Sequence, residues 1–251
     1  MKGISNFFWK ITISVFMLFV CTLSVSAKGK DDGERVLHGF SVNLDLLHPL
    51  LHLFNEDRMG INADIQFDLW HKLYPTFVVG YDWYDASDEY AYPIPANRNQ
   101  YDVNGLYFKV GAMYNLWKKD VSKTVNPMGY VGINYGCAPR YKFNIENYPI
   151  ANPYWGYAEN NFNATGRTTA HWGEVLLGVK APVAKNFCLG FEFMLKLFLN
   201  IKEQEIGNTD IRQSYAPGFG DKEIGRWGFR YTVGYFFPTG KTNKAKRLDE
   251  E

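Results

Sequence analysis

Two histidines four residues apart, His48 and His52, are the first candidates for chemistry. On a helix this spacing places two imidazoles side by side, which is an arrangement that zinc sites use. Pro49 stands between them, and no third ligand lies nearby in the sequence. We therefore interpret both as loop histidines, and we predict neither a metal site nor a cofactor.

A histidine, a carboxylate and a serine that suit a hydrolytic triad occur at His171, Glu174 and Ser214. They would act as base, orienting group and nucleophile. Geometry defines a triad, however, and no nucleophile-elbow motif surrounds Ser214. The sequence therefore favours a protein without catalytic residues. An outer-membrane enzyme that modifies lipid is the alternative.

The elements that must position these residues show strict alternation of apolar and polar side chains. Between Met59 and Leu69 the odd positions are apolar and the even positions are polar or glycine. A strand sends alternate side chains to opposite faces, whereas a helix would mix the two sets. The same pattern recurs in seven further segments, at residues 39–46, 76–83, 106–116, 130–136, 174–180, 187–201 and 227–237. Eight such segments predict an all-β fold.

The links between the segments alternate in length. Those around residues 71–74, 117–127 and 181–186 are short or of middle length, and those around 48–57, 85–103, 138–170 and 202–225 are mostly long. Bacterial outer-membrane barrels have an even number of strands, short periplasmic turns and long external loops. We therefore predict a closed antiparallel transmembrane β-barrel of eight strands at residues 36–238, followed by a charged periplasmic tail at residues 239–251.

The N-terminus predicts export. Lys2 and Lys10 precede a mostly apolar stretch at residues 11–25, and small residues follow up to Ala27. This is the pattern of a secretory signal peptide, and the stretch is shorter than the roughly 20 apolar residues of a spanning helix. We expect a signal peptide at residues 1–27, a lead-in at residues 28–35 and a location in the outer membrane.

The composition of the chain limits the kinds of partner that we expect. The formal net charge is +1, whereas nucleic-acid binding needs a basic face, so nucleic acid is not an expected partner. Aromatic residues make up 17% of the chain, which suits a barrel whose outer face is in lipid. Cys137 and Cys188 fall near opposite ends of their predicted strands, so we predict no disulfide.

Alternation alone does not say which face of the barrel points outward. A lipocalin-like carrier would place the apolar face inside, around a ligand. Here the polar face is rich in glycine and small polar residues and carries charges of both signs, so we predict that it lines a filled, ion-paired lumen as a structural network: Asp64, Asp68, Asp82, Lys109, Glu174, Lys180, Glu192, Lys196 and Arg230. Aromatic residues near the strand ends predict two girdles at the lipid–water interfaces, which include Trp70, Tyr74, Trp83, Tyr84, Trp117, Trp172, Trp227 and Phe237.

The third predicted external loop, at residues 141–170, is the best candidate for surface recognition. It combines many asparagines with Tyr148, Tyr154, Trp155, Tyr157 and Phe162. Aromatic rings among adaptable amides are typical of recognition surfaces, and long loops on rigid scaffolds often bind partners. Rings that pack on one another and shield the barrel mouth are an equally good interpretation.

Four stretches resemble a Bacteroidetes family of small outer-membrane β-barrels of unknown function. They are WGEVLLG at residues 172–178, KNFCLGFE at 185–192, YAPGFG at 215–220 and WGFRYTVGY at 227–235. More distantly, the plan resembles barrels of the OmpX and OmpA-membrane-domain type. The resemblance implies contact with outer-membrane lipid and insertion by the barrel-assembly machinery, and it brings no catalytic residues. Phe237 precedes Pro238 and the charged tail rather than ending the chain, which departs from the terminal aromatic signal of such barrels.

These patterns together predict a non-enzymatic outer-membrane barrel with a structural or surface-recognition role. Its expected partners are outer-membrane lipid and lipopolysaccharide, the barrel-assembly machinery during insertion, and a surface ligand that the sequence does not identify.

Overall fold

A computed structural model describes residues 37–51, 58–89, 98–118, 125–152, 156–201, 205–206, 209–210, 215–221 and 227–239. The predicted signal peptide and lead-in, and the tail from residue 240 onward, lie outside these residues. No helix in the described part of the chain is long and apolar enough to cross a membrane.

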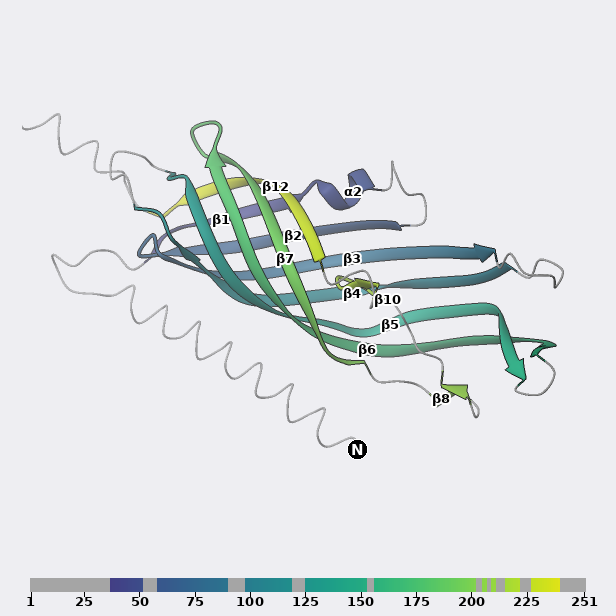
Figure 1. The fold of residues 1–251 in the computed structure, drawn as a ribbon. Coiled ribbons are helices and arrows are strands. Elements are labelled where there is room, and N and C mark those ends of the chain that lie inside the picture. The colour runs from purple at the N-terminus through teal and green to yellow at the C-terminus, as the bar shows by residue number, and fades with distance from the viewer. Residues whose placement is uncertain are drawn as a thin grey trace, which may run out of the picture.

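Eight strands form a closed antiparallel barrel, in the order β1-β12-β7-β6-β5-β4-β3-β2 (Figure 1). They are β1 (Leu37–Asp45), β2 (Arg58–Leu69), β3 (Leu73–Glu89), β4 (Arg98–Asn115), β5 (Met128–Asn152), β6 (Gly156–Pro182), β7 (Phe187–Ile201) and β12 (Trp227–Pro238). The short elements are α2 (Leu47–Leu51), β8 (Glu205–Ile206), β9 (Thr209–Asp210), β10 (Tyr215–Ala216) and β11 (Gly220–Asp221). The predicted all-β, eight-stranded closed barrel is confirmed.

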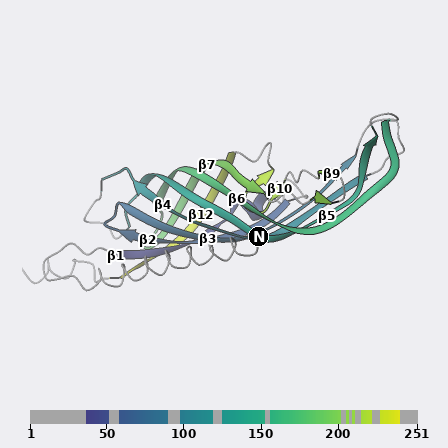
Figure 2. The same ribbon diagram turned by 90° about the horizontal axis from the view of Figure 1, so that it is seen from below.

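The two ends of the barrel differ. At one end, which we call the turn end, tight connections at residues 70–72 and 183–186 join β2 to β3 and β6 to β7. At the other, the ribbon end, β5 and β6 run on together as a ribbon that curves away from the barrel (Figure 2). In this ribbon β5 stays paired with β4 as far as Glu146. The prediction of a loop over residues 141–170 was wrong, because β5 continues to Asn152 and β6 begins at Gly156.

The polar face of the strands points inward and the apolar face points outward. In β12, Arg230 and Thr232 are buried inside, whereas Phe229 and Trp227 are 50% and 59% exposed. The same division holds around the barrel, and Ile133 on β5 is 66% exposed. A barrel of eight strands is just wide enough for its own side chains to fill the interior.

Glycines make room for the largest inward side chains. Three of them lie directly opposite an aromatic ring on the neighbouring strand: Gly80 with Tyr107, Gly136 with Trp172 and Gly178 with Tyr130. A Cβ on Gly136 would overlap the Trp172 indole, so a larger residue there cannot coexist with the ring in this position. The absence of a side chain at these glycines thus leaves room for the cross-strand rings inside the barrel.

Three residues predicted for the aromatic girdles point inward instead. Trp172 is fully buried in the interior cluster, Tyr84 packs against the same cluster, and Tyr74 packs against a second interior cluster at the turn end. Each of them has the same parity along its strand as inward polar residues, such as Glu174 on β6 and Asp82 on β3. The other predicted girdle residues, Trp70, Trp83, Trp117, Trp227 and Phe237, are exposed.

Candidate functional site: the barrel interior and its closing segment

A buried ion-pair cluster occupies the middle of the interior. The Arg230 guanidinium donates from Nε and Nη2 to the two oxygens of Glu192, at 2.8 and 2.7 Å. Its Nη1 lies 3.1 Å from Oδ2 of Asp64, and the Tyr130 hydroxyl donates to Glu192 Oε1 at 2.7 Å. Two carboxylates therefore share one guanidinium, and Glu192 binds it in the bidentate geometry that gives the strongest such contacts.

Next to this cluster, toward the turn end, Lys180 is held by neutral oxygens. Its Nζ donates to Ser41 Oγ at 3.0 Å, to Asn43 Oδ1 at 2.8 Å and to Gln66 Oε1 at 3.1 Å. Asn43 also donates to Asp64 Oδ1 at 2.6 Å. The amide of Asn43 thus links the lysine to the carboxylate cluster.

A second ion pair lies nearer the ribbon end. Lys109 Nζ donates to Glu174 Oε1 at 2.7 Å, and the Trp172 indole donates to the same oxygen at 2.9 Å. Asn134 donates to Glu174 Oε2 at 3.4 Å. The charge on Glu174 is therefore matched and its oxygens are occupied, as a carboxylate buried away from water requires.

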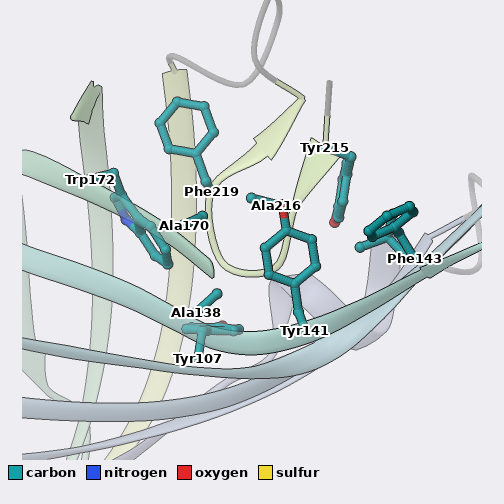
Figure 3. Packing of buried hydrophobic residues seen from close by; sticks show 10 residues of the cluster. Tyr107, Ala138, Tyr141, Phe143, Ala170, Trp172, Tyr215, Ala216 and Phe219 are labelled. Carbon is teal, nitrogen blue, oxygen red and sulfur yellow. The ribbon is translucent and has the colours of Figure 1, made fainter. Parts of the chain in front are cut away.

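At the ribbon end, a segment between β7 and β12 packs into the barrel mouth. Residues 215–221, here the closing segment, form a tight turn between β10 and β11. Phe219 packs edge-on against Trp172 (Figure 3). It also packs edge-on against Phe198, and Tyr215 stacks on Tyr84 with ring centroids 4.1 Å apart. The aromatic side chains of the closing segment are therefore buried against rings from the barrel wall.

Polar contacts fix the closing segment on both sides. Lys196 Nζ donates to the carbonyl oxygens of Gly218 and Phe219, at 3.1 and 2.7 Å. The Gly218 amide donates to Asp82 Oδ2 at 2.7 Å. Gly218 has a φ of 77° and lies against the Tyr107 and Trp172 rings, so only glycine suits this position. Two buried charges of the wall are thus used to hold backbone groups of the segment.

A comparison with models of known protein families gives a match to this chain. The model described as "Domain of unknown function (DUF6048)" matches residues 8–242. The chain belongs to the DUF6048 family. No curated protein matches it.

In this DUF6048 protein, all nine charged residues predicted for the lumen are buried inside the barrel. Asp64, Glu192 and Arg230 come together, Lys109 pairs with Glu174, and Lys180 joins the first group through Asn43. Asp82 and Lys196 meet at the closing segment, and Asp68 lies at the turn end, where its Oδ2 is 2.6 Å from His71 Nδ1. The entry of the closing segment into the barrel is not predicted by the alternation pattern, although an aromatic and proline-containing run within a polar loop is a usable signal.

The residues proposed for a triad are not brought together. His171 faces outward on β6, where its Nδ1 lies 2.7 Å from the Tyr135 hydroxyl. Glu174 faces inward on the same strand and is bound to Lys109. Because odd and even positions of a strand lie on opposite faces, these two side chains cannot act on one substrate. Ser214 lies outside the described residues.

The remaining predicted candidates are placed as follows. His48 Nδ1 lies 2.6 Å from Asp45 Oδ2 at the start of α2, and His52 is outside the described residues. Tyr148 and Phe162 are register partners on the ribbon, and Tyr157 stands opposite Ala151. Tyr154 and Trp155 are outside the described residues. Cys137 and Cys188 are free thiols.

Proposed function

We propose that this protein is an integral outer-membrane β-barrel that acts without catalysis, with a filled interior and with its ribbon end directed to the cell exterior. The observation that best supports this proposal is that apolar side chains face outward and charged side chains face inward, the reverse of a water-soluble protein. Large apolar side chains such as Ile61, Ile133 and Leu177 are 54%, 66% and 56% exposed, while charged groups fill the inside. Such a surface is unfavourable in water and suits acyl chains.

The exposed tryptophans support the same assignment. Trp70 and Trp117 lie at the turn end, and Trp83 and Trp227 lie toward the ribbon end, each between 43% and 59% exposed. Indole rings favour the two lipid–water interfaces, because one edge is apolar and the N–H can reach water. Two bands of outward tryptophans are what a barrel in a bilayer would present.

The two alternatives have less support. A lipocalin-like carrier would need an apolar interior around its ligand, and here the interior carries buried charges. A lipid-modifying enzyme built on these residues would need a base and its orienting carboxylate on one face, and His171 and Glu174 lie on opposite faces of β6.

The ribbon supports a surface-recognition role, with lipopolysaccharide as the partner. Lys142 and Arg167 are exposed register partners on β5 and β6, and Arg140 is exposed beside them. Like charges directly opposite each other destabilise a strand pair, so an anion between them would relieve the repulsion. The phosphate groups of lipopolysaccharide are anions that would lie at this level if the ribbon leaves the outer leaflet.

Insertion by the barrel-assembly machinery belongs to the same proposal. The closing strand β12 presents Tyr235 and Phe237 outward near its end, where their rings contact each other with centroids 4.8 Å apart. Aromatic residues near the end of the last strand are the feature that the resemblance to outer-membrane barrels implies for this step.

A spin-label experiment tests the location of the outward face. A nitroxide is attached at Ile133→Cys in the full chain in lipid vesicles, in a background where Cys137 and Cys188 are serine. We expect high collision rates with oxygen, which partitions into lipid, and low rates with a water-soluble nickel complex. The matched control is Lys142→Cys on the same strand, which should show the opposite preference.

Two outcomes would contradict the proposal. Equal access of the nickel complex to positions 133 and 142 would show that the apolar face is in water. Extraction of the protein from membranes by alkaline carbonate would show the same by an independent route.

A double variant tests lipopolysaccharide as the partner. Lys142→Ala combined with Arg167→Ala should lower the amount of lipopolysaccharide phosphate that co-purifies with the protein, while Lys185→Ala at the turn end should not.

A further inference from the structure

The described interior contains more carboxylates than fixed cations. Six buried carboxylates, those of Asp45, Asp64, Asp68, Asp82, Glu174 and Glu192, face four buried cations, those of Lys109, Lys180, Lys196 and Arg230. The buried carboxylates therefore outnumber the buried lysines and arginine by two. Asp45 and Asp68, one at each end of the barrel, each meet a histidine three residues later at 2.6 Å. The two ends therefore carry the same Asp–His pair.

Among the described residues, a second histidine joins the pair at the turn end. The rings of His38 and His71 approach with centroids 3.5 Å apart, at an interplanar angle of 44°. Ligand atoms of His38, Asp68 and His71 all lie within 4.8 Å of one another. Two imidazoles tilted against each other beside one carboxylate form a group that is distinct from the Asp45–His48 pair at the ribbon end.

Two irregularities of the backbone bring this group together. The register between β1 and β2 shifts between Leu37 and Gly39, so His38 stands in a bulge. In a regular strand His38 would share the outward face of Phe40, and a bulge re-aims a side chain. The bulge therefore accounts for the approach of the His38 ring to His71.

The second irregularity is the turn between β2 and β3. Trp70 and His71 have φ angles of 52° and 55°, in the left-handed region that normally takes glycine or asparagine in such hairpins. Residues held in this region are strained and often mark functional sites. Here the strained turn is what points the His71 imidazole back at Asp68.

We propose that His38, Asp68 and His71 bind a divalent transition-metal ion of the zinc class at the turn end. Imidazole nitrogens and a carboxylate oxygen are ligands that zinc accepts, with the fourth position open to water. Neighbouring ligands of a tetrahedral zinc lie roughly 3.3 Å apart, so the three groups need only small rotations to enclose an ion.

The environment of Asp68 supports a cation. Asp68 is 4% exposed, and its Oδ1 is buried with no hydrogen-bond partner in the structure. Its Oδ2 contacts His71, which leaves the second oxygen able to accept a metal. A carboxylate buried in this way is stabilised by a positive charge at its unsatisfied oxygen.

The bound ion would join the start of β1 to the β2–β3 turn. Both segments lie at the turn end, and β1 is also the strand that closes the barrel against β12. The site would therefore fix the first strand at its entry into the barrel. This role does not depend on the location of the barrel or on what the ribbon contacts.

The test is a titration of the full-chain barrel in detergent with Zn²⁺ alone, after removal of metals by a chelator. We expect one ion per chain by calorimetry. His38→Ala, Asp68→Asn and His71→Asn should each weaken binding by at least about tenfold. Asparagine is chosen at position 71 because it tolerates a positive φ, so that this variant keeps the turn.

The matched control is His48→Asn, which removes the histidine of the other Asp–His pair and should leave the affinity unchanged. Co²⁺ in the wild-type chain provides a second measurement that needs no variant, because tetrahedral imidazole ligation gives intense visible bands. Failure of Zn²⁺ to bind, equal loss in His48→Asn, or a Co²⁺ spectrum like that of the aqueous ion would each overturn the proposal.

Discussion

Removal of the Glu192 carboxylate is the most informative perturbation of the interior. In Glu192→Ala, three donors lose their acceptor: Nε and Nη2 of Arg230 and the Tyr130 hydroxyl. Hydrogen bonds to charged groups contribute about 1.5–3 kcal/mol each, but those in one cluster are not additive. Arg230 would keep only Asp64, at 3.1 Å. Removal of one partner of a buried ion pair costs about 3–5 kcal/mol, and we expect a loss of unfolding free energy in this range.

Urea-induced unfolding in lipid vesicles, followed by tryptophan fluorescence, measures this loss. With a denaturant slope of about 2 kcal/mol per molar, a loss of 4 kcal/mol lowers the midpoint by about 2 M. Glu192→Gln is the matched variant, because it keeps the side-chain volume and one acceptor oxygen. It should fall between the wild type and Glu192→Ala, which separates the loss of charge from the loss of packing.

A double-mutant cycle with Arg230→Met identifies the cause. If the ion pair carries the effect, the double variant loses less than the sum of the two single variants, by about 2 kcal/mol. Additive losses, or a midpoint shift below about 0.5 M in Glu192→Ala, would refute the reasoning. The interior would then be stabilised by packing alone.

Two further predictions concern the closing segment and the width of the interior. Lys196→Met should speed hydrogen exchange of amides in the closing segment by about 10- to 100-fold, because two charge-assisted hydrogen bonds are lost. Lys180 is another buried lysine, but its Nζ donates to Ser41, Asn43 and Gln66, so Lys180→Met should not give this local effect. Gly136→Val should lower the free energy of unfolding by about 1–3 kcal/mol, because the new side chain overlaps Trp172. Gly173→Ala serves as its control, since a Cβ at Gly173 meets nothing within 4 Å, and the two variants should differ clearly in urea midpoint.

The strands of the barrel wall are readable from the sequence because each has one apolar and one polar face. The segment from Met59 to Leu69 matches β2 (Arg58–Leu69) almost residue for residue, and residues 187–201 match β7. The extensions of β5 and β6 are not readable in this way. Beyond the barrel neither face of the ribbon must be apolar, so alternation disappears while strand pairing continues.

The misplaced aromatics show a different limit. The place of Trp172 near a strand end predicts a girdle position, whereas its parity along β6 is that of the inward Glu174. Parity decides which face a side chain occupies, and position along the strand decides only its depth. A tryptophan inside a narrow barrel also needs a gap on the next strand, and Gly136 supplies it.

Contacts between side chains on distant segments could not be predicted from the sequence. The pairing of Arg230 with Glu192 follows from the register of adjacent strands, whereas its contact with Asp64 crosses from β12 past β1 to β2. Such a contact depends on closure of the barrel and on its width. The meeting of His38 with His71 depends on a bulge and a strained turn, which leave no pattern in the alternation.

The charged interior also fixes the register of the strands, if the barrel lies in a membrane. A slip of one residue would move every inward side chain of a strand to the lipid face. On β7 that would expose Glu192 and Lys196 together, and on β6 Glu174 and Lys180. A lysine or arginine facing the middle of a bilayer costs about 2–4 kcal/mol, and its abandoned partner would stay buried and unpaired. An apolar interior would lack this penalty, because both faces of each strand would then suit lipid. The ion-paired interior therefore makes one register far more favourable than its neighbours, which follows from the alternation of charge on each strand.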